Sequence, residues 1–266
     1  MRKKLTKEQK RQQMLKRIKE FRLLDDDFMT KCFEESIEAT ELVLRIVLDK
    51  PDIEVQKVQT QYTMKNIQGR SVRLDIYAKD SKDKRYNVEL QRADNGAGAK
   101  RARYNSSLID SNILPSGFDV EELTETFVIF ITEHDVMGAN EPVYHIERMV
   151  KETGMPFGDE AHIVYVNGAY RDESPLGLLM SDFACINPAD MHYKILADRT
   201  RYFKEEEKGV AAMCKAMEDL CNDAKTEEKE EIAERLLKQG TLSVEQIAEC
   251  VGLDVETVIE LAEDIK

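Results

Sequence analysis

The stretch RLDIYAKDSKDKRYNVELQR, residues 73–92, supports the fold prediction most directly. Strand-forming residues flank the charged segment DSKDK, a pattern typical of two antiparallel strands joined by a turn. Side chains alternate between the two faces of a strand, so the first strand is expected to separate its apolar residues from its polar ones. The expected apolar face holds Val72, Leu74 and Ile76, and the opposite face holds Arg73, Asp75 and Tyr77.

The second strand carries polar residues that are unusual for a half-buried sheet. Apolar residues alternate there with Asn87, Glu89 and Gln91, so Asp75 and Glu89 are expected to meet across the hairpin. Two such anions repel each other, and a hard divalent cation such as Mg²⁺ relieves the repulsion. A metal bound there would activate a water and neutralise charge on a phosphodiester. The competing interpretation is that both carboxylates pair with neighbouring basic residues on a solvated strand face.

The segments around the hairpin predict a mixed sheet flanked by helices. Apolar residues at helical spacing over residues 27–50 predict one amphipathic helix, and residues 53–67 an imperfect strand. After the hairpin come a Gly-rich entry with a helix (93–114), a strand buried on both faces (127–131), another strand (161–170) and a short helix (174–183). The order helix, strand, strand, strand, helix, strand (αβββαβ) implies an α/β fold.

The spacing D…E-x-Q on consecutive strands resembles the PD-(D/E)xK nuclease motif, and the order of elements matches the core of that fold. The longer phrases RLDIYA, YNVELQRAD, KRARYNSSLIDSNIL, ETFVIFITEHDV and YHIER are similar to the recombination-promoting nucleases, also described as PD-(D/E)xK nuclease family transposases. The similarity extends over roughly residues 25–220. It implies a restriction-endonuclease-like core with a helical C-terminal extension.

The resemblance also implies a role for each residue of the motif. Asp75, Glu89 and the main-chain carbonyl of Leu90 would hold the metal, Mg²⁺ or Mn²⁺. Gln91 stands where the motif has lysine, and its neutral amide can orient the attacking water without accepting its proton or supplying positive charge. Leu74 stands where the motif has proline, which contributes no ligand. The expected catalytic residues are therefore Asp75, Glu89 and Gln91.

Two helices are expected to add side chains to this site. In this fold an acid of the first helix often completes the metal site, and among Glu34, Glu35 and Glu38 we expect Glu35 to do so. The second helix carries residues suited to a DNA backbone and a stacked base, although an ordinary solvated helix face is the alternative. With Arg73 of the hairpin, the expected nucleic-acid contacts are Lys100, Arg101, Arg103 and Tyr104.

Charge is distributed unevenly along the 266 residues. A formal net charge of -13 disfavours a nucleic-acid partner, but residues 1–22 contain ten Lys or Arg against two Glu, so the rest carries -21. This predicts a basic N-terminal arm over residues 1–22. A nuclease-like core (23–190), an acidic helical extension (191–240) and a small helix-turn-helix-like element (241–266) are expected to follow.

The C-terminal element lacks the features of a DNA reader. Ser243 and Gln246 form a capping-box pattern, and Gly252 is expected to end the first of its two helices. Base readout needs basic or amide side chains on the second helix, whereas residues 254–264 are acidic. We therefore expect this element to pack internally or to form a homo-oligomer.

Cysteine usage and hydropathy favour the cytoplasm. The five cysteines are scattered without C-x-x-C spacing, which disfavours a disulfide framework or a zinc knuckle and favours a reducing compartment. No apolar run approaches the roughly 20 residues of a membrane span, and a secretory signal pattern is absent. No membrane partner is expected.

The function expected from these patterns is a metal-dependent DNA endonuclease linked to recombination or mobile elements. A different class is a non-catalytic DNA-binding or scaffolding protein that retains the nuclease fold, in which Gln91 would mark lost chemistry. The sequence does not distinguish DNA from RNA as the nucleic acid.

Overall fold

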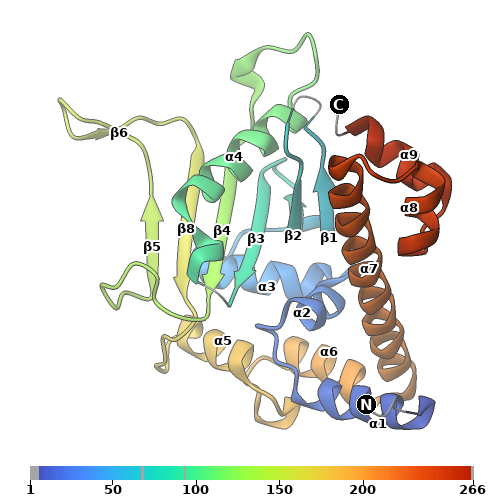
Figure 1. Ribbon diagram of the computed structural model, residues 1–266. Helices are drawn as coiled ribbons and strands as arrows, with labels where there is room; N and C mark the ends of the chain where they lie inside the picture. Colours follow the sequence, from blue (N-terminus) through green and yellow to red (C-terminus); the bar gives the residue numbers. More distant parts are fainter. Residues whose placement is uncertain (1–5, 67–68, 93, 265–266) are drawn as a thin grey trace. The chain divides into compact units, whose positions relative to one another are not determined.

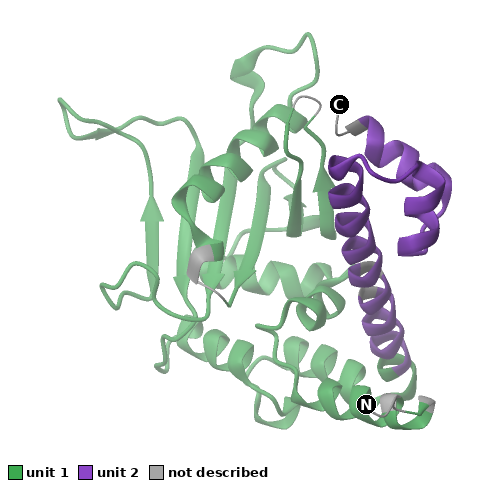
Figure 2. Ribbon diagram, viewed as in Figure 1, with its two compact units in different colours: residues 1–210 green, residues 211–266 purple. Residues whose placement is uncertain are grey.

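The computed structural model describes residues 6–66, 69–92 and 94–264. The chain divides into two compact units, residues 1–210 and residues 211–266 (Figure 2).

Unit 1 is built on a six-stranded mixed sheet in the order β1-β2-β3-β4-β8-β5 (Figure 1). Antiparallel pairing joins β1 (Val55–Met64) to β2 (Val72–Asp80) and β2 to β3 (Arg85–Gln91). Parallel pairing joins β3 to β4 (Thr126–Thr132) and β4 to β8 (Ala161–Asn167), and β5 (Val143–Ile146) runs antiparallel to β8. A separate two-stranded sheet pairs β6 (Met149–Val150) with β7 (Met155–Pro156).

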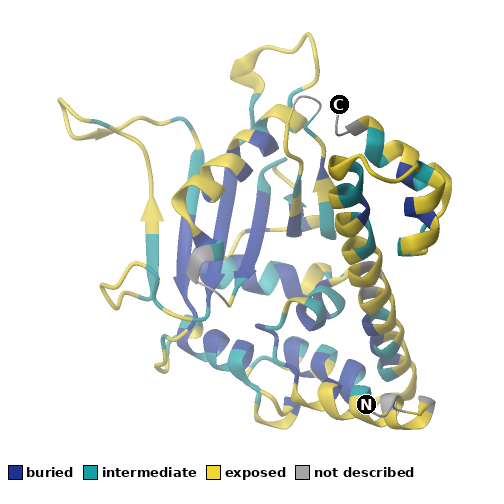
Figure 3. Cartoon of the chain, in the orientation of Figure 1, coloured by how far each residue is buried: buried dark blue, intermediate teal, exposed yellow. Residues whose placement is uncertain are grey.

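Helices cover both faces of this sheet, and β3 and β4 are buried along almost their whole lengths (Figure 3). Helix α4 (Ala99–Ile113) packs on one face over an apolar cluster that includes Val128 and Phe130. Helices α2 (Asp26–Phe33) and α3 (Ile37–Val47) contact β1 and cover the second face. Phe127 points to this face, and Lys50, just after α3, lies over its ring at 4.5 Å from the centroid.

The remaining helices of unit 1 pack against α2 and α3 or against one another, and short turns lie in the connections between elements. Helices α5 (Pro175–Ala184) and α6 (Lys194–Glu205) contact α3, and α1 (Lys7–Glu20) contacts α6. Short 3-10 turns occupy Asp94–Ala97, Val120–Glu122 and Pro188–Asp190. The predicted order αβββαβ, the hairpin at residues 72–91 and the α/β class are confirmed.

The single helix expected over residues 27–50 is wrong, because the chain turns between α2 and α3. Glu35 lies in this turn with a left-handed φ of 55°. Arg199 of α6 explains the end of α2: its guanidinium donates to the carbonyls of Cys32, Lys31 and Glu34 at 2.8, 3.1 and 3.0 Å. A side chain distant in sequence thus satisfies the carbonyls that a continuing helix would have used.

The expected basic arm includes residues 1–5, which lie outside the described residues. Residues 7–20 form helix α1, which begins with a capping box between Thr6 and Gln9 and buries Ile18 near its end. Lys204 of α6 secures this end: its ammonium group donates to the carbonyls of Lys19, at 3.2 Å, Phe21, at 2.5 Å, and Ile186. Residues 7–20 therefore form a helix whose C-terminal end packs within unit 1.

Unit 2 contains most of α7 (Glu207–Gln239), with α8 (Val244–Val251) and α9 (Val255–Asp264). Its small core consists of Ala233, Ile247, Ala248 and Val258. The capping box at Ser243 is present, and Gly252 ends α8 with a φ of 67°, a left-handed conformation that glycine adopts without strain. The division between residues 210 and 211 differs from the boundaries proposed at 190 and 240, since α6 packs against α2 and α1.

Replacing the buried Lys204 by methionine tests how α1 is anchored. Lys204→Met leaves the carbonyls of Lys19, Phe21 and Ile186 without their ammonium donor, and each buried unsatisfied acceptor costs about 1–3 kcal/mol. We expect urea unfolding to show a loss of about 3 kcal/mol in total. The exposed Lys208→Met is the control, and equal stability of the two variants would contradict this account.

Candidate metal-binding and nuclease site

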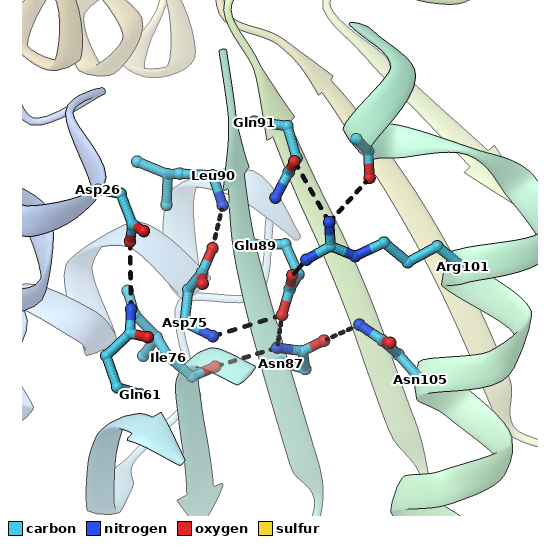
Figure 4. Close-up of polar contacts among 11 residues, drawn as sticks. Asp26, Gln61, Asp75, Ile76, Asn87, Glu89, Leu90, Gln91, Arg101 and Asn105 are labelled. Carbon is cyan, nitrogen blue, oxygen red and sulfur yellow. Dashed lines mark hydrogen bonds and ion pairs between the residues drawn. The ribbon is translucent and has the colours of Figure 1, made fainter. Parts of the chain in front are cut away.

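The site begins where strands β2 and β3 separate. Their antiparallel ladder ends at the pair Ile76–Val88, one residue short of Asp75 and Glu89. Beyond that pair, side chains replace the main-chain ladder: the Asp75 N–H donates to Glu89 Oε1 at 3.4 Å, and the Leu90 N–H donates to Asp75 Oδ2 at 3.0 Å (Figure 4). The two carboxylates, 7% and 0% exposed, thus lie at the point of divergence and are held by the strands themselves.

Regular alternation of side chains fails at this point of β2. Tyr77 and Leu74 both pack in the cluster beneath α4, although a regular strand directs residues three apart to opposite faces. Strand β1 is irregular at the same level: Gln61 has a left-handed φ of 51°, and the β1–β2 ladder omits the Gln61–Asp75 position. The predicted separation of Leu74 from Tyr77 is therefore wrong. The irregularity leaves the Asp75 carboxylate beside the Leu90 main chain, in the gap between the strands (Figure 4).

Glu89 is surrounded by donors from β3 and α4. Its Oε2 accepts a charge-assisted hydrogen bond from Arg101 Nη2 at 2.7 Å, and its Oε1 accepts from Asn87 Nδ2 at 2.9 Å. Asn87 Oδ1 in turn accepts from Asn105 Nδ2 at 3.4 Å, a more distant contact that orients the first amide. A buried carboxylate needs partners of this kind, since desolvation of an unpaired charge is costly.

The buried carboxylate of Asp75 has fewer compensating partners than that of Glu89. Burial is the main cause that raises its pKa from 3.8 to about 8, and the negative charges of Glu89 and Asp26 raise it further. The Leu90 N–H and the positive charge of Arg101 oppose this shift. At neutral pH the raised pKa favours the protonated form of the Asp75 carboxyl group, and a cation bound beside it would favour the ionised form instead.

Asp26, the first residue of α2, is an acidic helix residue that the sequence patterns did not single out, and its negative charge raises the pKa of Asp75. Gln61 Nε2 donates to Asp26 Oδ1 at 3.1 Å and to Thr30 Oγ1 at 3.0 Å. Gln61 Oε1 is buried and has no hydrogen-bond partner within the described part of the chain. Glu35, the residue expected here, is exposed in the turn after α2. The run Asp25-Asp26-Asp27 at a helix start was the signal in the sequence that could have identified Asp26.

Gln91 lies at the end of β3 beside the two carboxylates. Its Oε1 is 3.5 Å from Arg101 Nη1, which also donates to the carbonyl of Gly96 at 3.3 Å. A Cβ atom added at Gly96 would lie 1.9 Å from Gln91 Oε1, so a larger residue there would make the Gln91 amide move. The amide that replaces the motif lysine is therefore held between a glycine and a guanidinium group.

The structure separates the residues expected to contact nucleic acid. Arg101 turns toward Glu89, whereas Lys100 and Arg103 are exposed on α4. The Tyr104 hydroxyl donates to the carbonyl of Arg70, which ties α4 to the loop before β2. Arg73 is exposed on β2. Burial raises the pKa of Asp27, and the positive charge of Arg73 opposes this shift.

A hollow of about 390 Å³ lies next to Asp26. Ion pairs stabilise its surroundings: Arg92 contacts Asp25 at 2.6 Å and Glu133 at 3.1 Å, and Glu133 also pairs with Arg22 at 2.9 Å. The residues that line the hollow are Arg17, Glu20, Phe21, Asp25, Asp26, Asp27 and Arg92.

The oxygen atoms at the point where β2 and β3 diverge match the ligand set of a divalent cation only in part. Two carboxylates and nearby main-chain and amide oxygens are the ligands that Mg²⁺ and Mn²⁺ prefer, and a bound cation would oppose the burial and the negative charges that raise the pKa of Asp75. However, within residues 6–66, 69–92 and 94–264, no three His, Cys, Asp or Glu side chains are grouped closely enough to bind a metal by themselves. A cation here would depend on Asp75 and Glu89, with further oxygens from the main chain, an amide or the solvent.

Two carboxylates on diverging strands of an αβββαβ core define the PD-(D/E)xK class of proteins. The family model described as "PD-(D/E)XK nuclease family transposase" matches residues 32–169, and the chain belongs to this family. No curated protein and no solved structure matches the chain. In the described part of the chain, every helix is too short or too polar to cross a membrane.

The raised pKa of Asp75 predicts an unusual dependence of stability on pH. Because its pKa is raised in the folded state, the folded protein keeps a proton that the unfolded chain loses, so stability falls as pH rises between about 4 and 8. Asp75→Asn removes this loss. We expect the variant to gain up to about 1.4 kcal/mol relative to the parent per pH unit in this window, measured by urea unfolding.

The exposed Asp52→Asn is the matched control for this measurement. A hydrogen bond from Lys82 lowers the pKa of Asp52, so its titration lies below the window in question. A difference between Asp75→Asn and the parent that does not change with pH would contradict the raised pKa.

Proposed function

We propose that this chain is a metal-dependent endodeoxyribonuclease that hydrolyses phosphodiester bonds, with Mg²⁺ or Mn²⁺ as its cofactor. The observation that carries the proposal is the buried pair Asp75 and Glu89 at the divergence of β2 and β3, in a chain of the PD-(D/E)XK nuclease family. Structural ion pairs are usually compensated within the protein, whereas this pair leaves Asp75 with a raised pKa.

Each residue of the pair and its neighbours has a distinct role in this proposal. Asp75, Glu89 and the main-chain carbonyl of Leu90 would hold the metal. When bound, the metal supplies positive charge to the phosphodiester and lowers the pKa of a coordinated water. Gln91 orients the attacking water through its amide, which can both donate and accept hydrogen bonds but takes up no proton.

Asp26 takes the place that was expected for Glu35. Its negative charge raises the pKa of Asp75, and Gln61 holds its carboxylate by a hydrogen bond. The buried Oε1 of Gln61, which has no partner within the described residues, adds a second oxygen near the same position. We propose that Asp26 contributes to metal binding through a bound water.

The exposed residues Lys100, Arg103 and Arg73 support DNA as the substrate, because phosphate contacts from such side chains position a strand without reading its sequence. Tyr104, 37% exposed, could stack on a base or sugar. These local charges matter more than the overall charge of -13, since exposed charges are screened beyond about 10 Å.

Family membership also supports a role in recombination or in mobile elements. Cys32, Cys185, Cys221 and Cys250 carry free thiols, which supports the cytoplasm as the location. In unit 2, Val255 and Ile259 of α9 are exposed apolar residues, and they support a homo-oligomer formed through the C-terminal helices. The acidic composition of α9 supports this role over base readout.

Cleavage of plasmid DNA tests the proposed activity. With Mg²⁺ or Mn²⁺, the parent should nick plasmid, and Asp75→Ala and Glu89→Ala should each reduce the rate by about 10²-fold or more. Asp52→Ala, which removes an exposed carboxylate, is the control. Full activity in both site variants would refute the nuclease assignment.

The same experiment distinguishes the other candidate functions. Faster cleavage of RNA than of DNA under these conditions would change the substrate class. DNA binding without cleavage and without cation binding would favour a non-catalytic DNA-binding or scaffolding protein, for which the neutral Gln91 is the supporting observation.

A second prediction concerns the acid supplied by the helix. Asp26→Asn should weaken Mn²⁺ binding by about 10- to 100-fold in calorimetry, as losses of supporting residues around metals commonly do. The control is Glu38→Gln, an exposed acid on α3. If Glu35→Gln weakens binding and Asp26→Asn does not, the original assignment to Glu35 is correct.

A further inference from the structure

Because Gln91 is a neutral amide, the proposed nuclease lacks the positively charged lysine of its motif. Helix α4 brings a different positive charge to the same place. Arg101 extends from the first turns of α4 toward Glu89 and Gln91 (Figure 4). Its Nη2 lies 2.7 Å from Glu89 Oε2, and its Nη1 lies 3.5 Å from Gln91 Oε1. A positive charge therefore stands beside the amide that replaces the lysine.

This guanidinium group bridges a buried anion and the solvent. The Glu89 side chain is fully buried, whereas the Arg101 side chain is 43% exposed. Its contacts with Gln91 and with the carbonyl of Gly96, at 3.5 and 3.3 Å, are longer than strong hydrogen bonds. The side chain is thus anchored mainly through one carboxylate oxygen and retains donors that can reach a ligand from the solvent side.

Any metal ion that binds Glu89 must compete with Arg101 for the Glu89 carboxylate. Glu89 Oε1 already accepts from the Asn87 amide and from the Asp75 N–H, and Oε2 is occupied by Arg101. A guanidinium group stays charged at all accessible pH values, so it cannot withdraw by losing its proton. It can, however, exchange a carboxylate for a phosphate, since its planar donors match both groups.

We propose that Arg101 supplies the positive charge missing at position 91. It holds Glu89 while the carboxylates carry no divalent cation, and it transfers to a non-bridging oxygen of the DNA phosphate once they do. This inference rests on the proposed nuclease function. It makes Arg101 a catalytic residue that contacts the substrate, in addition to its ion pair with Glu89.

A purely structural Arg101 would behave in the opposite way. If it only braced Glu89, its removal would loosen a ligand and weaken cation binding. If it competes for Glu89, its removal should strengthen cation binding, because a like charge next to the site is lost. The sign of the change in affinity therefore separates the two roles without a measurement of catalysis.

Calorimetry with Mn²⁺ and the full-length chain, in the absence of DNA, makes this test. We expect Arg101→Ala to bind Mn²⁺ about tenfold more tightly than the parent, the size of effect that one nearby charge commonly produces. Arg101→Lys, which keeps the charge, should stay close to the parent. Arg103→Ala, which removes an exposed arginine of the same helix, is the control for cation affinity. Unchanged or weaker Mn²⁺ binding in Arg101→Ala overturns the proposal.

Cleavage at saturating Mn²⁺ provides the second measurement. Despite its tighter cation binding, Arg101→Ala should lose about 10²-fold or more in kcat, and added methylguanidine should restore part of the rate. Equal kcat in Arg101→Ala and the parent overturns the substrate contact. Failure of the proposed function is distinguishable, because the parent itself would then cleave nothing, whereas failure of this inference leaves an active parent.

Discussion

The structure of the site depends on the separation of two neighbouring strands around a pair of buried carboxylates. Where the β2–β3 ladder stops, the main-chain N–H groups of Asp75 and Leu90 donate to the side chains of Glu89 and Asp75. Buried N–H groups must find acceptors, and here the acceptors are the two carboxylates. The carboxylates thus replace the ladder and occupy the gap that its end creates.

This arrangement concentrates negative charge that the protein compensates unevenly. Glu89 receives a guanidinium group and an amide, whereas Asp75 receives one N–H and is affected by the charges of Glu89 and Asp26. Desolvation makes the imbalance costly, because a buried carboxylate without a countercharge retains its proton. A fold that only needed stability would gain by placing apolar residues here. The retained imbalance is the physical argument for the cation-dependent function proposed above.

Much of the fold followed from local patterns, and part of the site did not. The hairpin, the apolar strand β4 and the cap of α8 were predictable, since each depends on neighbours within a few residues. The end of α2 was not, because Arg199, far along the chain, satisfies its last carbonyls. That turn exposes Glu35, and Asp26 at the start of α2 is instead the acid whose charge acts on Asp75.

The sequence by itself determined the family, the order of the elements and the pair Asp75 and Glu89, because residue spacing on adjacent strands fixes which side chains can meet. Only the tertiary structure decided the direction of the Asp75 carboxylate, since the left-handed Gln61 on β1 accompanies the break in alternation on β2. It also decided the partner of Glu89. Arg101 on α4 and Glu89 on β3 come together through helix-on-sheet packing, which no local periodicity encodes.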